Sequence, residues 1–186
     1  MHVALGIVPP GDVRAAAAVA RDEVERPPGE LDAIPAEDLM VPLIRLGNLT
    51  TPNAMALCEA LPEPVADLAT AAPVRLAGAW VLENDEPGVG LRLQGDVDAI
   101  HTLARRLPPI VADHGYYVDR RSFQPFLPLA TITDATTLPY LERLATALEA
   151  HHGREWVVDG VQVLTRTWAA GSSGGWRVLA TVPTTR

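Results

Sequence analysis

The stretch SFQPFLPLATIT, residues 122–133, has the composition of a buried β-strand. A short apolar run bounded by polar residues and prolines is typical of a strand inside a sheet. A second run of this kind, MVPLIRLGNL at residues 40–49, occupies the corresponding place in the first half of the chain. Two proline-bearing strands at corresponding places raise the hypothesis of an internal duplication.

Further strands and helices are expected on either side of these two runs. We expect strands at residues 2–8, 40–49, 74–85, 89–95 and 123–132, and a long hairpin within 155–185 with its tip at AAGSSGG. We expect helices over residues 12–26, 50–69, 96–115 and 136–153, and a loop at 27–39. Asp12 is the expected N-cap of the first helix, and Thr51 before Pro52 marks the start of the second. Gly153 is the expected stop of the last helix.

This order of elements predicts an α+β protein. Helices mixed with hairpin-linked strands favour mostly antiparallel sheets over a doubly wound parallel sheet. With 186 residues, 48% of them hydrophobic, the chain can bury one substantial core, so we expect a single bilobal domain over residues 1–186.

Charge and cysteine content restrict the classes of function. The formal net charge is −8 and every one of the 15 basic residues is an arginine, which disfavours nonspecific binding of nucleic acid. A small anion, or an RNA end held in a local arginine pocket, stays open. Cys58 is the only cysteine, so no intrachain disulfide can form. We expect neither a leader nor a membrane-spanning segment, and we expect a cytoplasmic protein that does not enter membranes.

The two proline-bearing runs, MVPLIRLG (40–47) and FQPFLPLAT (123–131), resemble the paired motifs of the 2H phosphoesterase superfamily. This superfamily includes 2′-5′ RNA ligase-like proteins and cyclic nucleotide phosphodiesterases. The opening strand and helix, the LPYLERL helix and the last hairpin, with glycine before a late aromatic residue, are also similar to the family. The resemblance implies two pseudo-symmetric lobes, mostly antiparallel sheets flanked by helices, and a central groove.

The resemblance also implies where catalytic residues would lie. It places Met40 and Phe126 at the positions of the family's two histidines, and Pro42 and Pro128 at those of its two threonines. In the family one histidine is the general base, the other is the general acid, and the threonine hydroxyls bind the phosphate. None of the four replacements can transfer a proton or donate a side-chain hydrogen bond. Strand alternation puts residue 40 with 42, and 126 with 128, on one face.

We therefore expect no catalytic residue and no 2H-type activity, and an apolar groove that binds a small molecule, a nucleotide-like ligand or a protein partner. The alternative is an active RNA or cyclic-nucleotide phosphoesterase with a non-standard acid and base, such as His114 with an arginine. A third option is a groove filled by the protein's own side chains. The further candidate ligand-binding residues are Arg45, His114, Tyr117, Arg120, Arg121 and Thr131, of which Arg45 would enter the groove after a one-residue shift in register.

Neither a cofactor nor a metal is expected. His151 and His152 follow a helix end, where its dipole favours positive charge, but no ligand spacing for zinc accompanies them. His101 is expected on the polar face of a helix. GSSGG lacks the lysine and hydroxyl of a phosphate-binding loop and is expected to form a turn.

Overall fold

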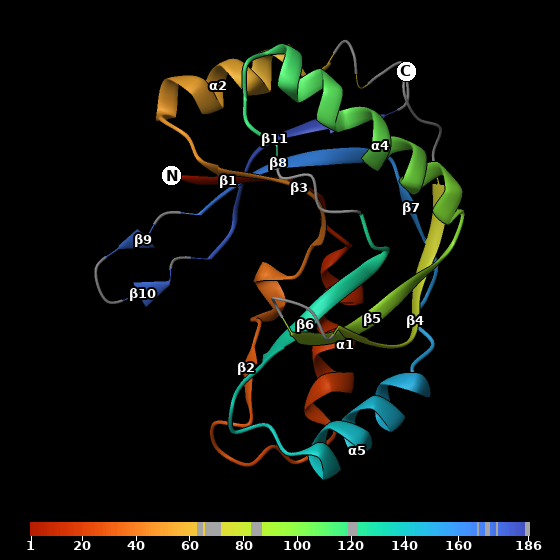
Figure 1. The fold of residues 1–186 in the computed structure, drawn as a ribbon. Coiled ribbons are helices and arrows are strands. Elements are labelled where there is room, and N and C mark those ends of the chain that lie inside the picture. The colour runs from red at the N-terminus through yellow and green to blue at the C-terminus, as the bar shows by residue number, and fades with distance from the viewer. Residues whose placement is uncertain are drawn as a thin grey trace.

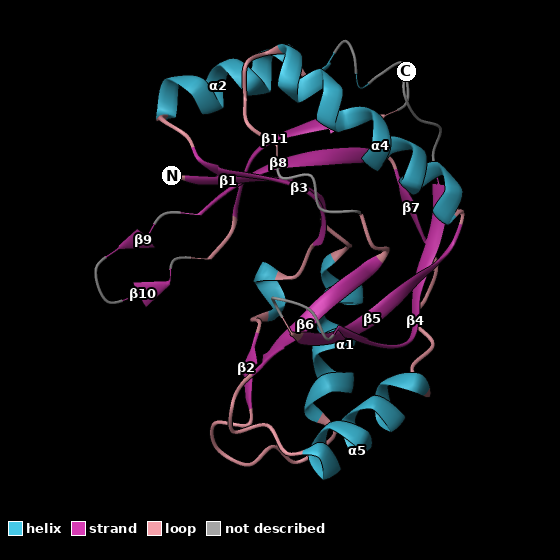
Figure 2. Ribbon diagram, viewed as in Figure 1, coloured by secondary structure: helices cyan, strands magenta, loops and turns pink. Residues whose placement is uncertain are grey.

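Two antiparallel sheets face each other in the computed structural model, which describes residues 1–62, 65, 72–82, 87–118, 123–166, 168–169, 172–173 and 175–184 (Figures 1 and 2). The first sheet has the order β11 (Arg177–Pro183), β8 (Gly160–Arg166), β1 (His2–Ile7), β3 (Val41–Asn48). The second has the order β2 (Leu31–Ala33), β6 (Phe126–Ile132), β5 (Gly88–Gly95), β4 (Ala72–Leu82), β7 (Trp156–Val158). A small ribbon pairs β9 (Trp168–Ala169) with β10 (Ser172–Ser173).

Helices cover the outer face of each sheet. The described helices are α1 (Gly11–Asp22), α2 (Thr51–Ala60), α4 (Val97–Asp113) and α5 (Leu138–Glu149), with a 3-10 turn at Ala36–Asp38. α2 and α4 lie over the first sheet, whereas α1 and α5 lie over the second (Figure 1). The expected α+β bilobal fold is confirmed.

The lobes do not coincide with the halves of the chain. α1 follows β1 of the first sheet but packs against β6 of the second, and α4 follows β5 but contacts β3 of the first. β7 and β8 are separated by Asp159 alone and belong to different sheets. The expected tail hairpin is therefore β8 with β11, while β7 extends the other sheet beside β4.

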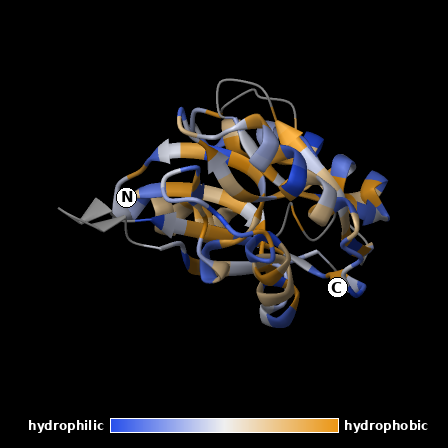
Figure 3. Ribbon diagram, turned by 90° about the horizontal axis from the view of Figure 1, so that it is seen from below, coloured by the Kyte–Doolittle hydropathy of each residue, from blue (hydrophilic) through white to orange (hydrophobic). Residues whose placement is uncertain are grey.

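One apolar core cluster includes residues of both sheets and the inner faces of the helices. In α4 the buried residues Ile100, Leu103, Leu107 and Val111 recur at helical spacing, as an amphipathic helix requires. The helices show both orange and blue segments in Figure 3, in agreement with one buried and one solvated face. No helix in the described part of the chain is long and apolar enough to span a membrane.

The helix starts differ from the expected caps. α1 begins after Pro10 without a side-chain cap, so the prediction that Asp12 is the N-cap is wrong. The Asp12 carboxylate instead accepts hydrogen bonds from Arg154, at 2.7 Å for Nη2, and this contact lowers the pKa of Asp12. At α2 the cap is Thr50 rather than Thr51, because the Thr50 hydroxyl accepts from the Asn53 amide.

α5 ends before the expected stop. Its last residue is Glu149 and its cap is Ala150, so Gly153 does not end the helix. Gly153 donates its amide to the Leu76 carbonyl at 2.8 Å, and a Cβ at Gly153 would lie only 3.0 Å from that oxygen. Burial lowers the pKa of His151 and favours its neutral form, contrary to the expected stabilisation of positive charge at this helix end.

The expected loop at 27–39 contains a short strand and a helix anchor. β2 lies within it and pairs with β6. The buried Glu30 accepts from the Thr137 amide at 3.2 Å and from the Thr137 hydroxyl at 3.0 Å. Thr137 is the N-cap residue of α5, so Glu30 supplies the acceptor for that helix end from a distant part of the chain.

Candidate functional site

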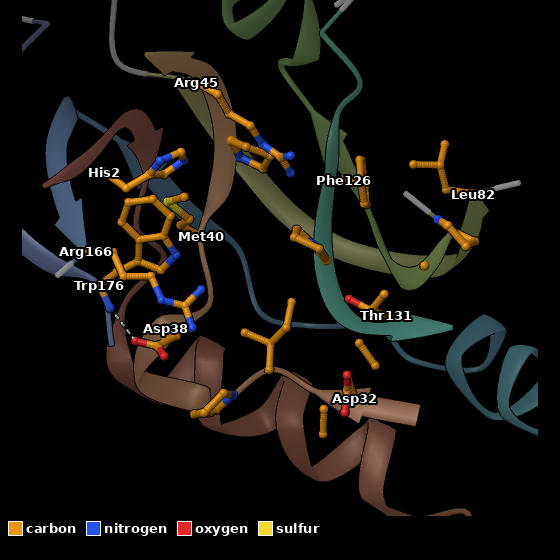
Figure 4. A pocket seen from close by; sticks show the side chains of 18 residues that line it. His2, Asp32, Asp38, Met40, Arg45, Leu82, Phe126, Thr131, Arg166 and Trp176 are labelled. Carbon is orange, nitrogen blue, oxygen red and sulfur yellow. Dashed lines mark hydrogen bonds between the residues drawn. The ribbon is translucent and has the colours of Figure 1, made fainter. Parts of the chain in front are cut away.

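A cavity of about 670 Å³ lies between the two sheets (Figure 4). It is lined by His2, Asp32, Ala33, Ile34, Pro35, Asp38, Met40, Pro42, Arg45, Leu82, Pro87, Gly88, Phe126, Pro128, Ala130, Thr131, Arg166 and Trp176. The four residues that the resemblance assigns to the motif positions, Met40, Pro42, Phe126 and Pro128, thus face one space. The described side chains do not fill the groove, contrary to the third option for this protein.

Strand β3 brings Arg45 into the cavity through a β-bulge. Leu5 of β1 pairs with Ile44 and Gly6 pairs with Pro42, so the ladder skips Leu43. An extra residue in one strand shifts the alternation of side chains beyond it. The cavity is therefore lined by Pro42 and Arg45 of β3 and by Met40, which directly precedes the strand. Arg45 thus enters the cavity together with Met40 and Pro42, without the one-residue shift in register that was considered for it.

Strand β6 has the same irregularity at the corresponding place. Val89 of β5 pairs with Ala130 and Gly90 pairs with Pro128, so the ladder skips Leu129. Residues 126, 128 and 131 line the cavity with the same spacing as 40, 42 and 45. Thr131 on β6 thus corresponds to Arg45 on β3. This repetition agrees with the hypothesis of an internal duplication.

Both prolines lie where a missing amide is tolerated. Pro42 is on β3, the edge strand of the first sheet, next to the bulge. Pro128 is next to the other bulge and beyond the part of β6 that β2 pairs with. Edges and bulges are the places in a sheet that accept proline.

Each proline has a glycine opposite it on the neighbouring strand. A Cβ at Gly6 would lie 3.0 Å from the Val41 carbonyl oxygen, and a Cβ at Gly90 would lie 2.2 Å from that of Leu127. Glycine is therefore required for the close strand approach at Gly90, and at Gly6 any larger residue would be a tight fit.

Aromatic side chains form the second-sheet wall. The Phe126 ring stacks on the Trp80 ring, with centroids 5.7 Å apart and planes inclined by 15°. The Arg92 guanidinium carbon lies 5.5 Å from the centroid of the Trp80 ring. The half-buried Phe126 therefore has one face covered by Trp80 while it lines the cavity.

Nitrogen-bearing side chains gather on the first-sheet wall. His2, Arg45 and Arg166 come from the adjacent strands β1, β3 and β8, and His2 pairs directly with Arg166 across the ladder. Figure 4 shows these three side chains on the side of the cavity where Met40, Trp176 and Asp38 lie. Guanidinium groups bind phosphate and carboxylate oxygens through charge-assisted hydrogen bonds, so this wall suits an anion.

Asp38 and Trp176 close one side of the cavity. The Asp38 carboxylate accepts a hydrogen bond from the Trp176 backbone amide at 2.7 Å, and the Trp176 ring centroid lies 6.1 Å from that of His2.

The sequence reasoning missed three cavity residues. Alternation along the tail strands did not identify Arg166 or Trp176, and His2 was also missed. The glycine before a late aromatic residue, here Gly175 before Trp176, was the one signal in the sequence for this wall.

Arg21 supports the cavity from behind the second sheet. This buried side chain on α1 donates through Nη1 to the carbonyls of Ile34, at 2.5 Å, and of Leu129, at 3.2 Å. Ile34 lines the cavity and Leu129 is the bulge residue of β6. Arg21 also forms two hydrogen bonds with Asp22 and lowers the pKa of that carboxyl group.

Two candidate residues lie elsewhere. His114 is the exposed residue after α4 and Tyr117 is 83% exposed, and neither lines the cavity. Arg120 and Arg121 fall outside the described residues. Within the described ranges, no group of three or more His, Cys, Asp or Glu side chains could hold a metal ion.

No family model and no curated protein matches the chain, but solved structures match its whole length. TT0787 of Thermus thermophilus is 20% identical, with 99% of this chain and 98% of that chain covered and a TM-score of 0.69. E. coli LigT in its apo form is 17% identical, the match covers 100% of this chain and 98% of LigT, and the TM-score is 0.73. E. coli LigT has also been crystallised with NADP+, phosphate, 3′-AMP and ATP.

A structure described as a phosphoesterase is 17% identical, the match covers 100% of this chain and 98% of that protein, and the TM-score is 0.70. At such identities the likeness establishes the fold. The resemblance inferred from the two proline-bearing runs is thereby confirmed at the level of fold, and this chain has the bilobal α+β fold of LigT, TT0787 and the 2H phosphoesterase-like proteins.

Proposed function

We propose that residues 1–186 act as one bilobal unit that binds a small, phosphate-bearing, nucleotide-like ligand in the inter-sheet cavity without 2H-type catalysis. The observation that carries this proposal is the lining of the cavity. Met40, Pro42, Phe126 and Pro128, which the resemblance assigns to the motif positions, line it together with Arg45.

The absence of proton-transfer groups at the motif positions supports a non-catalytic role. Thioether, phenyl and pyrrolidine groups carry no exchangeable proton at neutral pH. Loss of one general acid or base lowers a rate by roughly 10²- to 10⁴-fold. Here both the acid and the base of the family reaction are replaced, and so are the hydroxyls that would bind the phosphate.

The basic wall and the comparisons support an anionic ligand. Arg45, Arg166 and His2 line the first-sheet side. LigT, which shares the fold, has been crystallised with NADP+, phosphate, 3′-AMP and ATP, all of which carry phosphate groups. The formal net charge of −8 does not oppose such binding, because a local cluster of guanidinium groups determines the potential inside a cavity.

Two measurements on the purified protein test the proposal. Calorimetric titration with 3′-AMP and with inorganic phosphate is expected to detect binding, weakened by Arg45→Gln. Incubation with 2′,3′-cyclic nucleotides and with 2′-5′-linked dinucleotides is expected to give no product. Absence of binding, or turnover by the wild-type protein, contradicts the proposal.

A second candidate function is phosphoesterase activity with a non-standard proton-transfer group. The observation in its favour is that His2, unlike His114, lines the cavity beside Arg166. Turnover that is abolished by His2→Gln and retained by His114→Gln would support this candidate.

A further inference from the structure

Phe126 presents to the cavity an aromatic ring that the sheet holds in place. Trp80 covers one face of the ring at a centroid distance of 5.7 Å. Trp80 is itself held beside Arg92, whose Nε donates to the Ala79 carbonyl at 2.7 Å. A side chain that is already packed loses little freedom when a ligand contacts it, so the ring is pre-organised for recognition.

Glycines on β5 determine the space around this ring. Gly90 lies close to the Phe126 ring, because a Cβ there would be 3.2 Å from Phe126 Cδ2. Gly88, two residues earlier on the same strand, lines the cavity. It pairs with Leu82 on one side and with Thr131 on the other. A cavity-facing position without a side chain leaves room for a flat group above the backbone.

The two walls of the cavity differ in chemistry. The second-sheet wall has Phe126, Pro128 and Leu82, whereas the first-sheet wall has Arg45, Arg166 and His2 (Figure 4). Asp32, which pairs with Thr131, lies at the β2 end, and its carboxylate disfavours an anion there. Asp38 lies on the arginine side, where its carboxylate accepts the Trp176 amide and is outnumbered by the two guanidinium groups. A ligand that satisfies both walls carries a planar apolar group at one end and negative charge at the other.

We infer that the cavity binds a planar aromatic ring linked to a phosphate, with the ring against Phe126 and the phosphate toward Arg45 and Arg166. This rests on the proposed function and deepens it, because it assigns an orientation and makes Phe126 the residue that selects for the ring. The position at which the family has a proton-transferring histidine thus serves ligand recognition.

The test compares a ligand that has the ring with one that lacks it. Wild-type protein is titrated calorimetrically with 3′-AMP and with ribose 5-phosphate. Stacking of a base on an aromatic side chain predicts that 3′-AMP binds about tenfold more tightly. Phe126→Leu is expected to remove that difference by weakening 3′-AMP alone. Phe126→Tyr keeps a ring and is expected to retain the preference.

The chain offers a matched control in its other phenylalanine. Phe123 packs edge-on against His101, with centroids 5.1 Å apart, and does not line the cavity. Phe123→Leu is therefore expected to change neither affinity, and thermal melting of each variant shows that it is folded. A preference for 3′-AMP that survives Phe126→Leu, or equal weakening of both ligands, overturns the inference and leaves the proposed function standing. Failure of wild-type protein to bind either compound overturns the proposed function.

Discussion

Two bulge residues, Leu43 and Leu129, determine which side chains reach the cavity. Each follows a proline and is skipped by the ladder of the neighbouring strand. Without the bulges, strict alternation from residue 42 would turn Arg45 into the core. The glycines opposite the prolines permit the close strand approach in both sheets. The composition of the site therefore depends on single residues outside the cavity.

Gly90→Ala is expected to destabilise the protein. Its Cβ would lie 2.2 Å from the Leu127 carbonyl oxygen, which is backbone and cannot rotate away. Overpacking of this kind costs about 1–3 kcal/mol in the free energy of unfolding, measurable by urea denaturation. Gly11→Ala is the control, since the atom nearest to its Cβ is Arg14 Nη2 at 4.0 Å. Equal stability of the two variants would contradict the close strand approach.

Arg21→Met is expected to destabilise the protein and to weaken ligand binding. The substitution removes the guanidinium that donates to the buried Ile34 and Leu129 carbonyls. Loss of hydrogen bonds from a charged donor costs about 1.5–3 kcal/mol, measured by urea denaturation. Arg154→Met is the matched control, because the Arg154 pair with Asp12 is exposed and screened by water. A larger effect at Arg154 would show that Arg21 does not support the bulge.

At the scale of elements, one short segment links the two sheets and others add to the second sheet. β7 and β8 lie on either side of Asp159 in different sheets, and β2 pairs with β6 from far along the chain. The segment after α5 is held against β4 of the second sheet, since the His151 carbonyl accepts the Gly78 amide and His152 bridges to Ala77. These contacts explain why a histidine after a helix end is partly buried instead of solvated.

Acidification is expected to destabilise the protein through His151. Burial lowers its pKa below the ordinary value of 6.5, against the opposing effect of Glu23 and with the help of His152. Well above pH 6.5 the His151 side chain is neutral in both the folded and the unfolded protein. As the pH falls below 6.5, His151 is protonated in the unfolded protein before it is protonated in the folded protein. Protonation therefore favours the unfolded state, and the free energy of unfolding decreases.

The melting temperature should therefore fall less in His151→Asn than in wild-type protein between about pH 7.5 and about pH 5.5. His152→Asn, at the exposed neighbouring residue, should keep most of the wild-type fall, because burial of His151 is the larger cause of its lowered pKa. Equal losses in wild-type protein and in both variants would exclude His151 as the source.

At the scale of the whole molecule, the two lobes create the site together. Each sheet contributes one proline strand, and the cavity lies between them. Helix α1 follows a strand of the first sheet and packs on the second, while α4 follows β5 of the second sheet and contacts strands of both. One apolar core extends through both lobes. This interleaving opposes separation of the lobes, so ligand contacts from the two sheets act as one site.

Restoring the family residues is expected to create activity. The variant Met40→His, Pro42→Thr, Phe126→His, Pro128→Thr places two imidazoles and two hydroxyls at cavity-lining positions. Turnover of 2′,3′-cyclic nucleotides should rise at least about 10²-fold above wild-type protein. The pair Met40→His, Pro42→Thr alone should stay near the wild-type rate, because it supplies one proton-transfer group. A folded fourfold variant without turnover would contradict the assignment of these positions.

Much of the fold could be predicted because its signals are local. Strand alternation placed Met40 with Pro42, and Phe126 with Pro128, on shared faces that line the cavity. Most helices and strands were expected near their observed places. Helix ends were less accurate, as at Asp12, because a cap depends on backbone geometry and on competing partners such as Arg154.

The sequence by itself determined the α+β class and the two proline strands, and it predicted that the family's proton-transfer groups are replaced, because residue identity and strand period are properties of neighbouring residues. Only the tertiary structure decided that His2, Arg45, Arg166 and Trp176 join these strands around one cavity. Their arrangement depends on ladder partners far along the chain, on the bulges opposite Gly6 and Gly90, and on the stacking of Trp80 against Phe126. Such contacts arise when distant segments pair, and no local pattern of side chains encodes them.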